Sequence, residues 1–445
     1  MSTATPSPRL FALVDASNFY VSCQRVFEPR HRAVPVAVLS SNDGCVIARS
    51  EEVKAMGVPM GVPYFKVRDQ MTAAGTVVYS ANFELYQDMS RRVMETLGTF
   101  TPDVEVYSID EAFLRLDPAS PRALTYLAAR IHQRVLRWTG IAMRVSIAST
   151  RTLAKAGSEH ARSLQKRGEA PAVFLHDADQ ITALLDGVPA ESVWGIGRAH
   201  AAKLSAQGIR TARQLRDRPD EWIRQHLHTP GLRTVFELRG IPCSPESQLP
   251  HHRKSLLRSR SFGRSVTEQQ ELREAVAGHM ASAAMRLRAE GLVARHVSVY
   301  LFAREGRGAA RLRLVAGERQ SSPTNQTPEL LKAAMRCLER AFRPGERYGK
   351  AGVGLSEISP AGAAQSDLFA PDNARTPAML TALDERNARF GKGTIAFGSE
   401  GNIWGRARSR AERRDRESGH DWAAHCALRS PAFTTQWTDL APVRS

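Results

Sequence analysis

The chain has 445 residues, 42% of them hydrophobic and 24% charged, and its 62 Lys and Arg against 45 Asp and Glu give a net charge of +17. This composition is typical of a folded globular protein of about three domains, and it excludes a disordered chain, a collagen-like chain and a small disulfide scaffold. The positive charge favours a polyanionic partner such as nucleic acid.

The sequence also argues against a membrane or secreted protein. No apolar run approaches the ~18 residues that a membrane helix needs, and the N-terminus does not have the pattern of a signal peptide. The five cysteines are dispersed and form no CxxC pair. Such a set is expected of reduced thiols in the cytoplasm.

In chain order, the first expected element is a short buried strand over Leu10–Val14 that ends at Asp15. Apolar periodicity and turn residues then predict a strand over 34–39, helices over 50–56 and 83–97, a strand–turn–strand over 104–116, a helix over 123–138 and a strand over 141–148. Strands that alternate with helices up to about residue 175 indicate one α/β unit with an inserted lobe.

The second half of the chain has a different pattern. Residues 180–240 are predicted to be helical, and 242–245 form a proline-containing linker. An order of strand, helix, strand, helix, strand is then expected over 257–262, 271–290, 296–304, 328–342 and 351–358, which suits a small α+β domain. After Ser359 the pattern fades into a polar tail, in which the charge run 406–417 is expected to be a solvated helix or a disordered arm.

Three acidic residues are the first candidates for catalysis. Asp15, Asp110 and Glu111 each lie at the end of an apolar β-like run. Oxygen ligands without His or Cys suit a hard ion such as Mg²⁺, and two such ions can activate a hydroxyl and stabilise a leaving phosphate oxygen. Because neighbours on a regular strand face opposite ways, Asp110 and Glu111 can share a site only at a turn or bulge. A plain surface turn is the alternative interpretation of that pair.

A second candidate is the run VWGIGR at residues 193–198, which is followed by a helix that closes on Gly208. The pattern matches a helix–hairpin–helix, in which Gly195 and Gly197 let a phosphate approach the backbone amides without sequence readout. An ordinary helix connection is the alternative. No GxxxxGK[ST] motif occurs, which disfavours an ATP-driven helicase.

Three further runs resemble the signature of Y-family translesion DNA polymerases: FALVDASNFY at 11–20, SNDGCVIAR at 41–49 and YSIDEAF at 107–113. The second run, VWGIGR, SRSFG at 259–263 and the ending SPAFTT at 430–435 resemble the UmuC branch of that family. The likeness runs from about Leu10 to the C-terminus, so only residues 1–9 have no counterpart.

The resemblance implies an α+β multidomain, right-hand polymerase. Its palm would comprise residues 10–20 and 84–175, with the fingers at 21–83 and a helical thumb with the helix–hairpin–helix at 176–245. A little finger at 254–359 and a C-terminal partner-binding tail at 360–445 would follow. The implied activity is error-prone DNA-directed DNA synthesis across lesions in the SOS response.

The family also implies roles for single residues. Asp15, Asp110 and Glu111, with the Ala16 carbonyl, would hold two Mg²⁺ ions. Tyr20 matches the steric gate that excludes a ribose 2′-hydroxyl, although an aromatic core residue is the alternative from the sequence alone. Nucleotide binding is also implied for the following residues: Phe19, Ala48, Lys54 and Arg162. Lys54 stands where many members have Arg. Lys155, Glu159 and Arg162 share one helical face, so a salt-bridged surface is the alternative there.

The implied partners are primer–template DNA, dNTP, a UmuD′ dimer, the RecA filament and the β sliding clamp. Gln365, Leu368 and Phe369 resemble the anchors of a clamp-binding peptide, in which Ser366 replaces a usual Leu. Two other functions remain as alternatives: a non-catalytic scaffold of a mutagenesis complex and a metal-dependent nuclease. The three acids argue against the first, and the tyrosine gate argues against the second.

Overall fold

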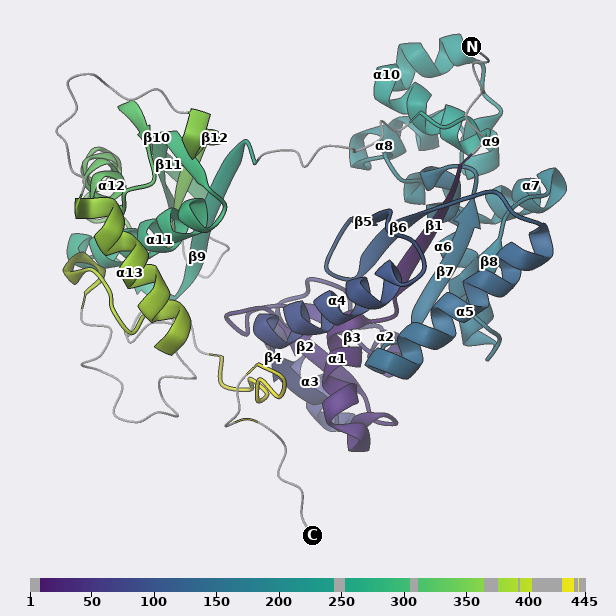
Figure 1. Ribbon diagram of the computed structural model, residues 1–445, viewed down its shortest axis with the longest axis horizontal. Helices are drawn as coiled ribbons and strands as arrows, with labels where there is room; N and C mark the ends of the chain where they lie inside the picture. Colours follow the sequence, from purple (N-terminus) through teal and green to yellow (C-terminus); the bar gives the residue numbers. More distant parts are fainter. Residues whose placement is uncertain are drawn as a thin grey trace. The chain divides into compact units, whose positions relative to one another are not determined.

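The computed structural model describes residues 9–243, 253–304, 311–363, 375–390, 393–401, 426–435 and 439 (Figure 1). They form two compact units. The first unit contains the described residues up to 243 except 40–44, together with 430–435 and 439; the second contains 40–44 and the described residues between 253 and 429. The observed mixture of helices and sheets is that of an α+β multidomain protein.

A five-stranded sheet forms the centre of the first unit, with the strand order β5-β6-β1-β7-β8. Its strands are β1 (Leu10–Ala16), β5 (Val104–Val106), β6 (Glu111–Leu116), β7 (Met143–Ala148) and β8 (Ala172–Phe174). The middle strand β1 is almost wholly apolar, and Ala12, Leu13 and Val14 are fully buried. Such a strand is stable only with neighbours on both sides, because each of its backbone groups then has a partner.

Three long helices pack against strands of this sheet: α4 (Phe83–Gly98), α5 (Pro121–Thr139) and α6 (Arg151–Lys166). Local signals fix their ends. Asn82, Ser120 and Thr150 cap the three helix starts with their side-chain oxygens, and Gly140 ends α5 in the left-handed conformation that glycine adopts without strain. The predicted helices over 83–97 and 123–138 and the predicted strands before and after them are therefore confirmed.

A three-stranded sheet of order β3-β2-β4 forms a second layer in this unit. It contains β2 (Val36–Leu39), β3 (Val46–Arg49) and β4 (Val77–Ser80), and its neighbours are α1 (Phe19–Phe27), α2 (Glu51–Ala55) and α3 (Arg68–Ala73). The strand over 34–39 and the helix over 50–56 were predicted. The short strands β3 and β4 were not, because four residues are too few to display a period.

The helical region that follows contains α7 (Ala178–Gly187), α8 (Arg198–Ala206), α9 (Ala212–Arg216) and α10 (Asp220–Leu238), as the sequence predicted. A buried carboxylate joins it to α6. Glu237 on α10 accepts hydrogen bonds from the backbone N–H (3.0 Å) and hydroxyl (2.6 Å) of Thr152. In return, the Thr150 hydroxyl donates to the Glu237 backbone carbonyl at 2.7 Å.

The second unit is built on a four-stranded antiparallel sheet of order β11-β10-β12-β9. The elements are β9 (Ser255–Val266), α11 (Gln269–Ala289), β10 (Leu292–Ala303), β11 (Arg311–Thr324), α12 (Thr327–Ala341) and β12 (Tyr348–Pro360). All were predicted except β11. This edge strand begins with the alternating run RLRL, but its second half, residues 317–324, is polar and shows no apolar alternation, and pairing with β10 defines the full strand.

A helix also lies in the segment that was expected to be a polar tail. In α13 (Arg375–Phe390), Leu380 is fully buried, and Asp384 receives two hydrogen bonds from the Arg288 guanidinium, at 2.7 and 2.9 Å. The run 406–417 and the clamp-like residues Gln365, Leu368 and Phe369 lie outside the described residues.

The five cysteines, all of them described, carry no disulfide. Among the described residues, no helix combines the length and the apolarity that crossing a membrane requires.

Candidate active site

The C-terminal end of β1 brings together an acid from each of two strands and one base. Asp15 lies directly opposite Glu111 at the start of β6 and opposite Arg144 on β7. Directly opposed residues of antiparallel strands project from the same face of the sheet, so the register places all three side chains together. The Arg144 guanidinium donates a hydrogen bond to the Asp15 carboxylate.

Asp110 reaches the site from the turn before β6. Its backbone carbonyl accepts a hydrogen bond from the Ala16 N–H at 2.8 Å, which fixes the turn against the end of β1. The Ser108 hydroxyl donates to the Asp110 carboxylate at 2.5 Å. The predicted turn between Asp110 and the strand is therefore present, and it gives the two adjacent acids different directions.

Each of the two strand acids is paired with a cation. Glu111 receives a hydrogen bond from Lys155 of α6 at 3.2 Å. Burial raises the pKa of Asp15 above its ordinary value, the Arg144 charge opposes that rise, and the negative charge of Asp110 adds to it. Burial likewise raises the pKa of Glu111 against the effect of Lys155, with smaller contributions from Asp15 and Asp110. The three carboxylates are thus close enough to disfavour one another's charge.

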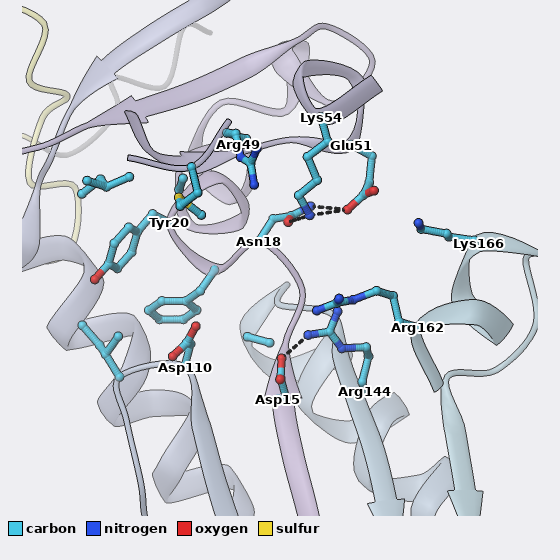
Figure 2. A pocket seen from close by; sticks show the side chains of 16 residues that line it. Asp15, Asn18, Tyr20, Arg49, Glu51, Lys54, Asp110, Arg144, Arg162 and Lys166 are labelled. Atoms are coloured by element: carbon cyan, nitrogen blue, oxygen red, sulfur yellow. Dashed lines mark hydrogen bonds and ion pairs between the residues drawn. The ribbon is translucent and has the colours of Figure 1, made fainter. Parts of the chain in front are cut away.

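A cavity of about 590 Å³ opens beside these acids, and most of the predicted site residues line it (Figure 2). The predicted residues on its wall are Asp15, Ala16, Phe19, Tyr20, Ala48, Lys54, Asp110 and Arg162. The residues on its wall that the sequence analysis did not select are Asn18, Ile47, Arg49, Glu51, Met60, Ile109, Arg144 and Lys166. Glu111 is not among the lining residues.

Basic side chains dominate the part of the cavity away from the acids. Figure 2 shows Lys54 and Arg49 across the cavity from Asp15, with Arg162 and Lys166 on a third side. Lys54 donates to the Asn18 side-chain oxygen at 2.5 Å and to Glu51 at 2.7 Å. Although burial opposes it, the hydrogen bonds from Lys54 and Asn18 hold the pKa of Glu51 below its ordinary value.

The α6 face that was predicted to be either phosphate-binding or salt-bridged has features of both. Arg162 pairs with Glu159 at 2.9 Å, as a salt-bridged surface requires, yet Arg162 also lines the cavity. Its Nε atom is buried and has no hydrogen-bond partner within the part of the chain that the structure describes. The Lys155 ammonium instead donates a hydrogen bond to Glu111. It also lies 4.4 Å from the ring centre of Tyr107 and 5.3 Å from that of Trp194.

Tyr20 lies in an aromatic cluster at the edge of the cavity. Its ring is stacked on that of Tyr86, with centres 4.4 Å apart and planes at 16°, and the ring of Phe83 meets it edge-on at 5.9 Å. The helix that carries Tyr20 starts at Asn18, which adopts a left-handed conformation (φ 50°) that Asn tolerates better than most residues. Tyr20 is therefore both a partly buried aromatic residue and a wall of the cavity.

The side chains of this site offer oxygen ligands, the type that hard divalent ions prefer. Asp15 and Asp110 are oxygen ligands on one cavity, and Glu111 is the cross-strand neighbour of Asp15. In the described conformation, Arg144 and Lys155 occupy two of the three carboxylates. Among the described residues, no group of three or more His, Cys, Asp or Glu side chains is arranged to hold a metal ion. A metal ion held by these acids would share the carboxylates with the two bases.

The two glycines of the predicted helix–hairpin–helix do not line the cavity. Gly195 has φ +94°, and a Cβ there would lie 2.6 Å from the Thr234 hydroxyl, so only glycine fits. Gly197 caps the start of α8 without a side-chain hydrogen bond, and the space around its Cα is open. The first amides of α8 are thus left without a side-chain cap.

The site residues that sequence analysis missed left weak signals. Arg49 directly follows Ala48 in the SNDGCVIAR run, and Asn18 lies within FALVDASNFY. Arg144 and Lys166 belong to no selected motif, and only the β1–β7 register and the end of α6 bring them to the cavity.

The carboxylates of Asp15 and Asp110, at the C-terminal end of β1 and in the turn before β6, thus lie on one cavity with a group of basic side chains. Three segments of the chain match models of known protein families. Residues 14–159 match the impB/mucB/samB family, residues 253–368 match the C-terminal domain of the same family, and residues 377–443 match a domain of unknown function.

Curated relatives match over almost the entire chain. Protein UmuC of Salmonella typhimurium is 39% identical over 98% of this chain and 100% of its own length. Protein SamB of Salmonella typhimurium is 36% identical over 97% and 99%. DNA polymerase IV of Brucella melitensis is 28% identical over 88% and 86%. The chain belongs to the impB/mucB/samB family.

Proposed function

We propose that this chain is a Y-family DNA polymerase that performs error-prone translesion synthesis in the SOS response. The family membership and the relatives named UmuC and DNA polymerase IV support this function. One observation carries it on the structural side: a single cavity has Asp15 and Asp110 on one wall, the four bases Arg49, Lys54, Arg162 and Lys166 on the others and an aromatic residue, Tyr20, at its edge.

The reaction that suits this cavity is nucleotidyl transfer. The 3′-hydroxyl oxygen of a primer loses its proton to solvent and attacks the α-phosphorus of a dNTP. The bond from that phosphorus to the oxygen shared with the β-phosphate breaks, and pyrophosphate leaves with the electron pair. Lys54, Arg49, Arg162 and Lys166 line the cavity and would neutralise a triphosphate, which is most of what such a transfer demands of the protein. Tyr20 would meet the sugar, and Phe19 and Ala48 would complete the nucleotide pocket.

Asp15, Asp110 and Glu111, with the Ala16 carbonyl, are the residues that would hold two Mg²⁺ ions. When bound, these ions would lower the pKa of the primer hydroxyl and neutralise charge on the phosphates. Arg144 and Lys155 would keep the acids charged and oriented before loading.

The units of the structure suggest the parts of a right-hand polymerase. The five-stranded sheet with α4, α5 and α6 would be the palm, and the three-stranded sheet with α1, α2 and α3 would be the fingers. Helices α7 to α10 would be the thumb, in which Gly195 and Gly197 would let a DNA phosphate approach the start of α8. The unit of β9 to β12 would be the little finger.

The proposed partners follow from the same family. Primer–template DNA and dNTP are the substrates, and a UmuD′ dimer, the RecA filament and the β sliding clamp would act with the enzyme. The five free thiols suit the reducing cytoplasm, where such an enzyme would meet the chromosome.

Primer extension with the Asp110→Ala variant tests the function. Extension on a primed template with dNTP and Mg²⁺, in the presence of UmuD′, RecA and the clamp, should fall by at least ~100-fold, because the cavity loses a charged ligand. Asp69→Ala is the matched control, since Asp69 is an exposed acid on α3 whose side chain is 93% accessible. Equal extension by Asp110→Ala and the parent would refute the assignment.

The same experiment addresses the alternative of a non-catalytic scaffold. A scaffold would show no extension in the parent, while DNA binding by the parent and by Asp110→Ala would be equal. Degradation of the primer in the absence of dNTP would instead identify a nuclease.

A further inference from the structure

The aromatic ring of Tyr20 is positioned by Tyr86, which is itself completely buried on α4. The Tyr86 hydroxyl accepts a hydrogen bond from the Gln24 side-chain amide at 2.9 Å. Gln24 is one helical turn after Tyr20 on α1 and is only 1% exposed. The stacked ring of Tyr86 therefore holds Tyr20 from one side, and Gln24 fixes the far end of that ring.

Both helices of this arrangement are bonded to a segment from the far end of the chain. The Gln24 amide also donates to the Ser430 hydroxyl at 3.0 Å, across 406 positions of sequence. Asn82, the fully buried residue that caps α4, donates to the Ser430 backbone carbonyl at 3.0 Å, to the Ser430 hydroxyl at 3.1 Å and to the Pro431 carbonyl at 3.1 Å. Ser430 thus joins the helix of Tyr20 to the helix of Tyr86.

The next residues of this segment fill an apolar contact on α1. The ring of Phe433 is stacked on that of Phe27, with centres 4.8 Å apart and planes at 5°. Tyr20, Gln24 and Phe27 are spaced i, i+4 and i+7, which places them on one face of the helix. Ala432 and Phe433 are both buried, and the Ala432 N–H donates to the Asp439 carboxylate at 2.9 Å.

From these contacts we infer that Ser430–Phe433 is a positioning element for sugar selection: it braces α1 against α4 and so fixes the Tyr20 ring. The inference rests on the proposed function, in which Tyr20 excludes the ribose 2′-hydroxyl. It gives a role to part of the region, 377–443, that matches a domain of unknown function. Ser430 and Phe433 touch neither the cavity nor Asp15, so they act only through Gln24, Tyr86 and Tyr20.

The physical reason is the burial of the amides. Without Ser430, the buried side chains of Gln24 and Asn82 lose acceptors, and each unsatisfied group of this kind costs ~1–3 kcal/mol. The helices can recover hydrogen bonds only by moving relative to each other or by admitting water. Either change releases the Tyr86 hydroxyl, and the stacked Tyr20 ring then samples positions that leave room for a 2′-hydroxyl.

The test compares incorporation of ribonucleotides with that of deoxyribonucleotides. In the full chain, Ser430→Ala and Phe433→Ala should each raise the ratio of rNTP to dNTP incorporation by about tenfold, equivalent to ~1.4 kcal/mol. Thr435→Ala, an exposed residue of the same segment, is the matched control and should leave the ratio unchanged. Ser430→Ala removes one hydroxyl and keeps the backbone contacts to Asn82, so it serves if Phe433→Ala does not fold.

A double-mutant comparison separates positioning from general stability. In a Tyr20→Ala background, Ser430→Ala should have no further effect on the ratio, because the group through which it acts is gone. If Ser430–Phe433 only stabilised the fold, Ser430→Ala and Phe433→Ala would reduce dNTP and rNTP incorporation equally. An unchanged ratio in Ser430→Ala and Phe433→Ala, or a rise that persists without Tyr20, would overturn the inference.

A second readout does not need activity. With 3-fluorotyrosine in place of tyrosine, the ¹⁹F resonance assigned to Tyr20 should shift or broaden in Ser430→Ala and stay unchanged in Thr435→Ala. If the Tyr20 resonance in Ser430→Ala does not shift or broaden, the positioning role is wrong, even if the parent polymerises DNA. Conversely, a shifted resonance in a chain that does not extend primers would support the positioning of Tyr20 by Ser430–Phe433 and refute the polymerase function.

Discussion

Arg144 and Asp15 face each other across the β1–β7 pair, and the guanidinium donates to the carboxylate that the proposed function assigns to a metal ion. The Arg144 side chain is 7% exposed and that of Asp15 is 21% exposed. A nearly buried base would therefore compete with such an ion for the Asp15 carboxylate. This competition makes the site's response to divalent ions measurable.

Arg144→Met should lower the stability of the ion-free protein, because Asp15 keeps a half-buried charge without its main partner; breaking such a pair costs ~3–5 kcal/mol. Mg²⁺ should then raise the melting temperature of this variant more than that of the parent, since no base has to be displaced. Thermal denaturation with and without Mg²⁺ measures both effects. The same Mg²⁺-dependent gain in both proteins would contradict the competition.

Gly197→Asp should weaken binding of primer–template DNA by about tenfold while the helix stays folded. The backbone of Gly197 is extended (φ −83°, ψ 169°), so Asp fits and its carboxylate caps the α8 amides that a phosphate would use. Gly197→Ala is the control, because a methyl group enters open space and leaves the amides available. Fluorescence anisotropy at low salt measures the affinity, and equal affinities of the two variants would exclude α8 as a phosphate contact.

Glu237→Gln should reduce the free energy of unfolding of the first unit by ~1–3 kcal/mol. The Glu237 carboxylate accepts hydrogen bonds from the N–H and hydroxyl of Thr152 and, at 3.3 Å, from the N–H of Cys243. An amide would direct its own NH₂ group at one of them. Urea denaturation of this variant, with the exposed Glu221→Gln on the same helix as control, measures the difference; equal midpoints would show that the carboxylate is not required.

Replacing Leu368 and Phe369 by Ala should reduce retention of the β sliding clamp in a pull-down with the full chain. The two apolar anchors supply most of the contact of an extended peptide in a groove. Restoring the usual Leu at Ser366 should increase retention relative to the parent. Undiminished retention by the double Ala variant would disprove the docking peptide.

Much of the fold was predictable because its signals are local. The apolar run of β1, the capped helices α4 and α5 and the turn at Asp110 are visible in hydrophobic period and turn residues over a few positions. The edge strand β11 and the helix α13 were missed, because their stability comes from pairing with β10 and from the Arg288–Asp384 contact. Such contacts join residues far apart in sequence.

The sequence by itself determined which residues are candidates for the chemistry: three acids at strand ends, an aromatic residue after the first of them and the bases Lys54 and Arg162. Only the tertiary structure decided which side chains these residues contact: Arg144 pairs with Asp15, and Lys155 pairs with Glu111. It also decided that the distant Ser430 accepts a hydrogen bond from Gln24, beside Tyr20 on the same helix. The reason is physical. Residue type and short-range period are encoded locally, whereas the partner of a buried polar group is chosen by strand register and chain packing, which emerge only when the whole chain has folded.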